Sequence, residues 1–190
     1  MNEKNSIKKW ETISSYYALD NKFMKIRREC VRLPDGTIYD EYYVNEEIGW
    51  VAIFCITNNG QVVLNKQYKH GIRQVVLELP AGNIEIDDSS PKVAAVRELE
   101  EETGYISDEW EEVTRFIIDP TKSTGYLYIF LARNARRSVK QKIDIKEIIN
   151  VELVPINQVI RKVRNSEISV QGHVASIYYV LDKLGFLATI

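Results

Sequence analysis

Apolar and aromatic residues gather along the first quarter of the chain in runs short enough for strands. Three such runs, rich in Tyr, Ile and Val, occupy residues 10–19, 22–33 and 37–44. Asp20-Asn21 and Pro34-Asp35-Gly36 separate them, and both are typical turn sequences. This pattern predicts an antiparallel ladder of strands at the N-terminus.

A hairpin is expected next, because two apolar runs over residues 50–57 and 61–68 flank Asn58-Asn59-Gly60. Asn and Gly tolerate the positive φ angles that tight hairpin turns require. A further short apolar strand over residues 75–79 ends at Pro80-Ala81-Gly82.

The pattern then changes to helical spacing. Ser90 can cap a helix, Pro91 suits the first helical position, and Gly104 is typical of a left-handed C-terminal cap. Ala94, Ala95, Leu99 and Glu102 recur between them at helical spacing. A helix is therefore expected between Ser90 and Gly104.

The remaining sequence continues this mixture of strands and helices. Five more elements are expected, namely strands over 110–118, 126–132 and 148–154 and helices over 156–164 and 172–184. The basic run 133–142 is expected to be a solvated loop. The order of elements predicts an α/β (α+β) fold, strand-rich first and helix-capped last. With 190 residues the chain suits a strand extension over 1–46 and a main domain over 47–190.

Composition excludes several classes of protein. Hydrophobic residues make up 45% of the chain and charged residues 27%, which is typical of a globular protein rather than a disordered one. The net charge of −2 gives no general attraction to nucleic acid or anionic membranes. Cys30 and Cys55 form no disulfide pattern, and Cys55 is expected to be buried. No secretion signal or membrane span is recognised, so a cytoplasmic location is expected.

The candidate chemistry lies on the helix between Ser90 and Gly104. Glu98, Glu101 and Glu102 stand at positions i, i+3 and i+4, so they share one helical face. Three carboxylates on one face repel each other unless a positive group compensates them. A solvated acidic face and a site for Mg²⁺ or Mn²⁺ with oxygen ligands both satisfy this pattern, and the pattern alone leaves them equally open.

The same segment resembles the Nudix box, Gly-x5-Glu-x7-Arg-Glu-U-x-Glu-Glu-x-Gly-U, in which U is a bulky apolar residue. Arg97-Glu98-Leu99-x-Glu101-Glu102-x-Gly104-Tyr105 matches its second half in full. The first half departs, because the loop after Gly82 is one residue longer. The middle Glu position falls on Asp88 when counted from Gly82 and on Ser89 when counted from Arg97. We expect Asp88 to take over part of its structural role.

The resemblance extends from Trp10 to about Leu184, and it is closest to the ADP-ribose pyrophosphatase branch of the Nudix hydrolases. The segments that carry it are Trp10-Glu11-Thr12, Pro34-Asp35-Gly36, Trp50-Val51-Ala52, Gln67-Tyr68-Lys69-His70-Gly71, Leu77-Glu78-Leu79-Pro80-Ala81-Gly82 and Lys146-Glu147-Ile148-Ile149. It implies a Nudix fold, with a mixed sheet sandwiched between helices and an N-terminal antiparallel strand extension.

The resemblance also implies an activity, the Mg²⁺-dependent hydrolysis of a nucleoside diphosphate linked to another moiety. The first candidate is ADP-ribose, which would give AMP and ribose 5-phosphate. Another nucleotide sugar or a dinucleoside polyphosphate is an alternative substrate. A catalytically silent module that binds a nucleotide is the alternative from a different class.

Metal-binding roles follow from the resemblance position by position. The carbonyl of Ala81 and the carboxylates of Glu98, Glu101 and Glu102 match ligands of Mg²⁺, for which Mn²⁺ can substitute. Arg97 matches the residue that orients these glutamates, although an ordinary exposed arginine is the alternative.

Glu147 falls where the branch places a loop glutamate that binds metal or activates water. Asp144 is a nearby competitor for this role, and a solvated charge before a strand is as good an explanation of Glu147. His70 and His173 stand alone, and each is expected to be structural.

Five further residues match or neighbour substrate contacts. Lys69 stands where relatives usually carry Arg, and it offers a point charge rather than a fork of donors. Glu78 either supports the site or is a buried, paired carboxylate. Trp10 and Tyr42 could stack on a base, with core or strand packing as the alternative. Lys122 could meet a phosphate or be solvated.

The N-terminal strands contain too little sequence for a core of their own. They must pack on their own domain or pair with a second copy. The resemblance implies a homodimer in which these strands help to form the partner's site.

Overall fold

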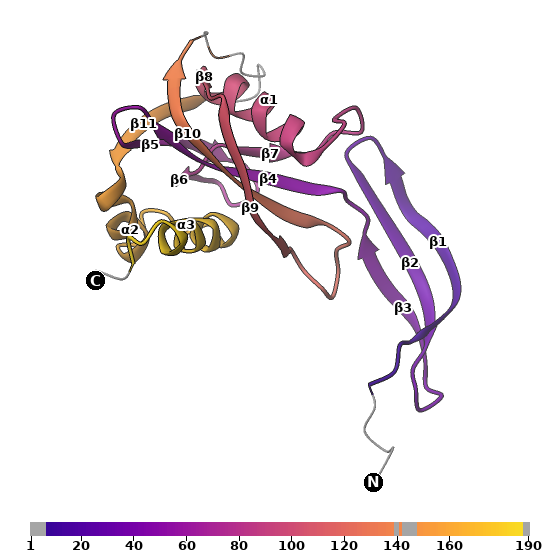
Figure 1. Cartoon of the computed structure of the whole chain (residues 1–190). Helices are drawn as coiled ribbons and strands as arrows, with labels where there is room; N and C mark the ends of the chain where they lie inside the picture. The colour runs from indigo at the N-terminus through magenta and orange to yellow at the C-terminus, as the bar shows by residue number, and fades with distance from the viewer. Residues whose placement is uncertain (1–6, 139–140, 142–147, 188–190) are drawn as a thin grey trace. The chain divides into compact units, whose positions relative to one another are not determined.

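The computed structural model describes residues 7–138, 141 and 148–187 (Figure 1). Internal contacts divide the chain into two compact units. The first consists of Met1–Ile48 and Ile117–Gly125, and the second of Gly49–Phe116 and Tyr126–Ile190. No helix within the described ranges is long and apolar enough to cross a membrane.

The first unit contains an antiparallel sheet, as the runs rich in Tyr, Ile and Val and the turn sequences between them predict. Among its described residues the sheet has the order β1 (Glu11–Asn21), β2 (Met24–Arg32) and β3 (Ile38–Asn45). Side chains in both turns fix the chain reversals. Asn21 Oδ1 accepts hydrogen bonds from the backbone N–H groups of Phe23 and Met24, at 2.8 and 3.0 Å. Asp35 Oδ1 accepts one from Thr37, at 2.9 Å.

The second unit is built on a mixed sheet, which has eight strands in its described part. The central order is β11-β5-β4-β10-β8, with β6 beside β5, β7 beside β4 and β9 beside β10. Strands β4 and β10 pair in parallel. The pairings of β10 with β8, β11 with β5, β4 with β5 and β7, and β5 with β6 are antiparallel. The strands are β4 (Gly49–Thr57), β5 (Gln61–Lys69), β6 (Gln74–Glu78), β7 (Ala81–Asn83), β8 (Tyr105–Ile106), β9 (Glu109–Ile117), β10 (Tyr126–Arg137) and β11 (Ile149–Pro155).

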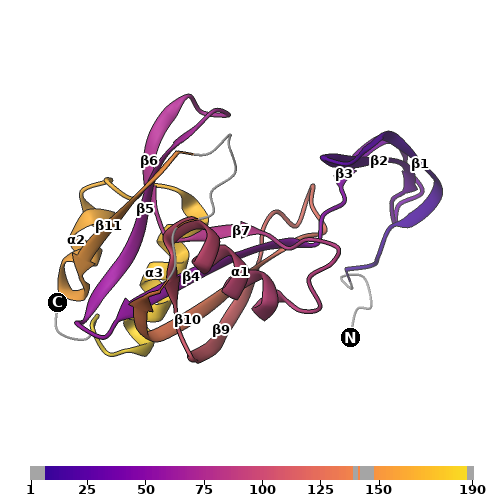
Figure 2. The same cartoon turned by 90° about the horizontal axis from the view of Figure 1, so that it is seen from above.

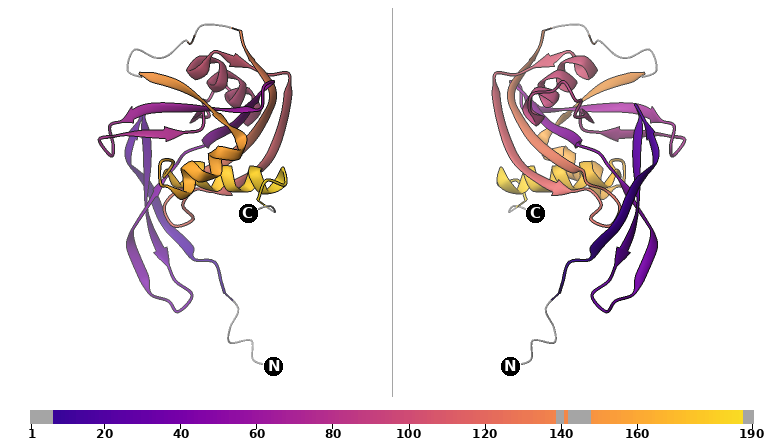
Figure 3. Two further views of the ribbon diagram at one scale, coloured as in Figure 1. Left: turned by 90° about the vertical axis from the view of Figure 1, so that its left-hand side faces the viewer. Right: turned by 90° about the vertical axis from the view of Figure 1, so that its right-hand side faces the viewer.

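Helices cover both faces of this sheet. Helix α1 (Pro91–Thr103) lies on one side, and α2 (Ile156–Arg164) and α3 (Gln171–Lys183) lie on the other (Figures 1 and 3). This arrangement confirms the expected α/β fold with a mixed sheet between helices and an N-terminal antiparallel sheet. The predicted hairpin around residues 58–60 is also present, because β4 and β5 are joined there.

The basic run 133–142 differs from the expectation of a solvated loop. Strand β10 continues to Arg137, and β8 pairs with its end at Arg136 and Arg137. Arg133 lies 3.0 Å from Glu111, and Arg136 lies 2.9 Å from a carboxylate of the preceding loop, Asp108. Backbone pairing with β8 and β4 therefore keeps this part of the run in the sheet, and the exposed ion pairs add little to it. This pairing is between distant segments, so the local sequence does not display it.

Helix α1 packs against β4 (Figure 2), and one cluster of the second unit's core lies between this helix and the sheet. Ala94, Ala95 and Leu99 form the buried face of α1, and Ile53 belongs to the same cluster from β4. Cys55 is buried there as expected, and burial raises the pKa of its thiol to about 12. Packing on this side therefore fixes the place of the helix that carries the candidate chemistry.

Replacing Leu99 by Ala should lower the free energy of unfolding by about 2–5 kcal/mol, because it removes a fully buried side chain and leaves a cavity. Urea denaturation followed by circular dichroism measures the effect. Val93→Ala is the matched control, since Val93 lies on the same helix and is exposed. A midpoint for Leu99→Ala equal to that of the Val93→Ala control would contradict this account of the core.

Candidate active site

Helix α1 follows β7 through a short loop and carries the charged half of the Nudix-box motif. Ser90 Oγ accepts a hydrogen bond from the backbone N–H of Val93, at 3.4 Å. At the other end Gly104 adopts φ 71° and donates its N–H to the carbonyl of Glu100, at 2.9 Å. The helix therefore begins and ends where the sequence predicts, and the residues from Arg97 to Glu102 occupy its second half.

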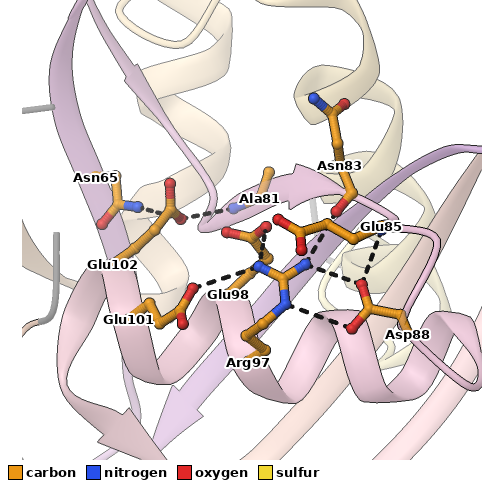
Figure 4. Close-up of polar contacts among 9 residues, drawn as sticks. All are labelled: Asn65, Ala81, Asn83, Glu85, Asp88, Arg97, Glu98, Glu101 and Glu102. Atoms are coloured by element: carbon orange, nitrogen blue, oxygen red, sulfur yellow. Dashed lines mark hydrogen bonds and ion pairs between the residues drawn. The ribbon is translucent and has the colours of Figure 1, made fainter. Parts of the chain in front are cut away.

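Glu102 ties this helix to two strands. It is 5% exposed, and its Oε2 atom accepts hydrogen bonds from Asn65 Nδ2 on β5 and from the backbone N–H of Ala81 on β7, at 2.8 and 2.9 Å (Figure 4). A buried carboxylate is costly unless donors surround it, and these two donors come from segments distant in sequence. Glu102 thus fixes the distance between the helix and the strand end at Ala81.

Arg97 lies at the centre of a charged cluster on the same helix (Figure 4). Its Nη1 atom lies 2.7 Å from Glu98 Oε1 and 3.3 Å from Glu101 Oε2. Its Nη2 atom lies 3.0 Å from Asp88 Oδ2 and donates to the carbonyl of Asn83 at 3.1 Å. One guanidinium therefore joins the loop to two of the predicted metal ligands.

Asp88 shows how the longer loop is stabilised. Hydrogen bonding to Arg97 holds the pKa of the Asp88 carboxyl below its usual range. Burial lowers the pKa of Arg97, but its bonds to Asp88 and Glu98 outweigh this and leave the pKa above its usual value. Asp88 Oδ2 also accepts the N–H of Glu85, at 2.9 Å. This carboxylate occupies the bracing position for which the sequence offered Asp88 or Ser89.

Gly82 allows Glu98 to approach the backbone of β7. A Cβ atom on Gly82 would collide with the carboxylate of Glu98. The first glycine of the motif is therefore required by a close approach, since any other residue would push the Glu98 carboxylate out of its place.

A cavity of about 330 Å³ opens beside this motif in the second unit. Carboxylates and a strand end form one side of it, and an aromatic ring, a lysine and a histidine also contribute. Its lining consists of Trp50, Lys69, Glu78, Ala81, Gly82, Asn83, Glu85, Glu98, Glu102 and His173. The structure thus brings four of the predicted site residues on β7, α1 and β5 to the same cavity as Glu78.

Lys69 and Glu78 meet in this cavity. Lys69 Nζ lies 2.8 Å from Glu78 Oε1, and Gln67 Nε2 donates to the same oxygen at 2.7 Å. His173 Nε2 lies 3.2 Å from Glu78 Oε2. Glu78 is therefore a buried, paired carboxylate, and its supporting role in the site stays a prediction.

The donor set suits a hard divalent cation in its chemistry. Glu98, Glu102 and Ala81 line one cavity and offer oxygen atoms, which Mg²⁺ prefers. Because Gly82 has no side chain, the Glu98 carboxylate has room beside β7, which also suits a cation site. Glu101 instead contacts Arg97, and within the described ranges no group of three or more His, Cys, Asp or Glu side chains is already arranged around one point.

Three predicted substrate contacts lie in the first unit, whereas the cavity belongs to the second. The rings of Trp10 and Tyr42 meet edge to face at 5.8 Å, and the hydroxyl of Tyr42 donates to the carbonyl of Thr121 at 2.5 Å. Lys122 follows Thr121 in a turn held by Asp119, whose Oδ1 accepts the backbone N–H of each. Their roles stay predictions. Glu147 and its competitor Asp144 lie outside the described residues.

Sequence reasoning overlooked several residues of this cavity. Trp50 lines it and belongs to a segment that carries the family resemblance, but it was given no role in the site. Asn83 and Glu85 also line it, Asn65 holds Glu102, and these three residues carry no local signal. His173 was expected to be structural, and it is buried, but its contact with Glu78 could not be predicted from an isolated histidine. All of these placements depend on contacts between distant segments.

Comparison with known proteins identifies the family of this chain. A family model of the NUDIX domain matches residues 48–171, and a model of the nucleoside diphosphate sugar hydrolase N-terminal domain matches residues 10–45. An ADP-ribose pyrophosphatase of Bacillus subtilis (strain 168) is 28% identical over 159 residues, which are 83% of this chain and 85% of the relative. One of Mycobacterium tuberculosis is 31% identical over 160 residues, covering 84% and 77%.

Two further comparisons extend over nearly the whole chain. A methanol dehydrogenase activator of Bacillus methanolicus is 25% identical over 171 residues, covering 90% of this chain and 91% of the relative. A crystal structure of an ADP compounds hydrolase superposes with a TM-score of 0.84 over 98% of this chain and all of that chain, at 17% identity, which shows the shared fold. Because the NUDIX model covers more than half of the chain, this protein belongs to the Nudix family and is a Nudix hydrolase.

Proposed function

We propose that this protein hydrolyses the diphosphate bond of a nucleoside diphosphate linked to another moiety, and that ADP-ribose is its substrate. The products are then AMP and ribose 5-phosphate. The names of the two pyrophosphatase relatives and the match to the nucleoside diphosphate sugar hydrolase N-terminal domain support this choice. We further propose that the protein acts in the cytoplasm.

The charge of the cavity carries the proposal. Its described lining contains four glutamates, and only one lysine stands among them. Such a cavity repels a diphosphate unless a cation neutralises part of the lining. Members of this family typically use a divalent metal, and we propose Mg²⁺, with Mn²⁺ as a substitute.

Residues of the motif divide the work between them. Glu98, Glu101, Glu102 and the carbonyl of Ala81 would hold the metal, which neutralises phosphate charge and lowers the pKa of bound water. Arg97 keeps Glu98 and Glu101 on the correct side of α1 through its two contacts. We propose that the loop glutamate Glu147, or Asp144, takes part in activating water.

Lys69 supplies positive charge on the other part of the cavity. Its side chain is 43% exposed while that of Glu78 is 4% exposed, so the ammonium reaches the open side of the pair. An ammonium meets a phosphate as a point charge, without the paired geometry of a guanidinium. We therefore propose that Lys69 contacts the substrate diphosphate.

An assay with ADP-ribose tests the proposed reaction directly. With Mg²⁺ present, chromatography should resolve AMP and ribose 5-phosphate as the products, and EDTA should abolish turnover because the glutamates then hold no cation. A panel of nucleotide sugars and dinucleoside polyphosphates is assayed in parallel. Faster turnover of another diphosphate would replace ADP-ribose as the substrate, and no turnover of any of them would favour a silent nucleotide-binding module.

Replacing Glu98 by Gln should lower kcat by about 100-fold or more while leaving the fold intact, because a metal ligand loses its charge. The circular dichroism spectrum and the turnover of ADP-ribose are measured together. Glu100→Gln is the matched control, since Glu100 lies on the same helix and outside the cavity lining. Near-normal turnover by Glu98→Gln would remove Glu98 from the metal ligands.

We also propose that the protein is a homodimer that pairs through its N-terminal sheet. All eleven residues of β1 are exposed in the single chain. Large apolar side chains are among them, with Trp10 just before the strand 49% exposed, and Tyr16 and Tyr17 exposed to a similar degree. A three-stranded sheet with uncovered apolar residues gains stability when a second copy covers it.

Light scattering after size-exclusion chromatography should give twice the 22.0 kDa mass of one chain. Ile13→Lys on β1 should shift the protein towards the monomer, because it places a charge in the proposed interface. Ile148→Lys, at an exposed apolar position of the second unit, should leave the mass unchanged. A monomeric mass for the unmodified chain at micromolar concentration would refute the dimer.

A further inference from the structure

The N-terminal end of α3 is closely packed against one side of the cavity. A Cβ atom on Gly172 would lie 2.6 Å from the Trp50 ring and 3.0 Å from Leu127, so no larger residue fits there without displacement. The next residue, His173, places its ring 5.3 Å from that of Trp50, at an angle of 50°. Both rings line the cavity. The position of His173 is thus fixed by tight packing.

His173 is the buried end of a chain of charged contacts. It is 3% exposed, and its Nε2 atom lies 3.2 Å from one oxygen of Glu78. The other oxygen of Glu78 lies 2.8 Å from the ammonium of Lys69. The histidine is therefore connected, through a buried carboxylate, to the lysine at the open side of the cavity.

This chain of contacts is not explained by stability. Burial raises the pKa of Glu78, but hydrogen bonding and charge from His173 and Lys69 outweigh it, so the pKa lies below its usual range. The carboxylate is thus ionised, and Nε2 must carry the proton that meets it. In the described part of the chain, Nδ1 of His173 is buried without a hydrogen-bond partner. An apolar residue at position 173 would avoid the cost of burying a nitrogen atom without a hydrogen-bond partner.

We propose that His173 is a positioning residue for Lys69. By fixing one oxygen of Glu78, it fixes the direction in which the other oxygen holds the lysine ammonium. A lysine side chain is long and flexible, and its ammonium lacks the rigid fork of a guanidinium, so its position must be imposed by its partner. The inference rests on the proposed function, in that Lys69 is taken to contact the substrate diphosphate.

A double-mutant cycle separates this role from a general effect on the fold. His173→Leu should raise the KM for ADP-ribose by about 10-fold with kcat changed less than about twofold. The reason is that the contact of Lys69 with the diphosphate, present both in the bound substrate and in the transition state, is weakened. Lys69→Ala should raise KM at least as much. In the Lys69→Ala background, His173→Leu should change KM by less than about twofold, since residues acting through one contact are not additive.

Two further variants test the contact with Glu78 itself. His173→Gln keeps an N–H donor within reach of Glu78 and should retain most of the affinity, whereas His173→Asn is polar but too short to reach it. This pair decides the question even if His173→Leu fails to fold. Tyr178→Leu, at a partly exposed position of α3, is the control for changes in that helix and should leave KM unchanged.

Additive effects of His173→Leu and Lys69→Ala on KM would overturn the proposal, as would an unchanged KM in folded His173→Leu and His173→Asn. Failure of the proposed function is distinguishable, because it appears as absence of ADP-ribose turnover by the unmodified protein. The same cycle is then measured as the dissociation constants of ADP-ribose and ADP by calorimetry. Coupling between residues 69 and 173 in that binding supports the positioning role, and its absence overturns it.

Discussion

A buried carboxylate, that of Glu102, holds the site together. Its Oε2 atom accepts hydrogen bonds from Asn65 on β5 and from the backbone of Ala81 on β7, so one oxygen joins a helix to two strands. Removing a charge from water is costly, and only well-placed donors offset that cost. The same contact sets how close α1 stands to the strand end at Ala81. The cavity lies beside this junction. The position of its acidic side therefore depends on Glu102, which both lines the cavity and holds the helix to the strands.

Arg97 compensates the negative charge of neighbouring glutamates on α1. Without it, the carboxylates of Glu98 and Glu101 would stand on one face with no positive charge between them. The guanidinium contacts both and also reaches Asp88 in the preceding loop. That loop is one residue longer than the family pattern, yet its aspartate still meets the arginine. A shorter acidic side chain on a longer loop can reach the same partner, so the departure in sequence leaves the brace intact.

Local sequence predicted the parts of this fold that depend on neighbouring residues. Ser90, Pro91 and Gly104 gave both ends of α1, and Asn-Gly gave the hairpin between β4 and β5, because caps and turns are decided within a few residues. The continuation of β10 through the basic run was not foreseen, since it depends on backbone pairing with β8. The placement of Asn65, Trp50 and His173 at the cavity depends likewise on the tertiary fold.

This difference has a consequence for substrate recognition. The acidic side of the cavity comes from one continuous motif, in which Gly82, Arg97 and Glu98 keep fixed spacing. A motif with fixed spacing can be recognised in the sequence. The other contributors come from β4, β5, β6 and α3, and their mutual contacts join residues far apart in the chain. If the proposed function holds, changes there would alter which diphosphate is held without changing the motif. On that proposal, the hydrolytic chemistry is encoded locally in the sequence, whereas the choice of substrate depends on packing between distant elements.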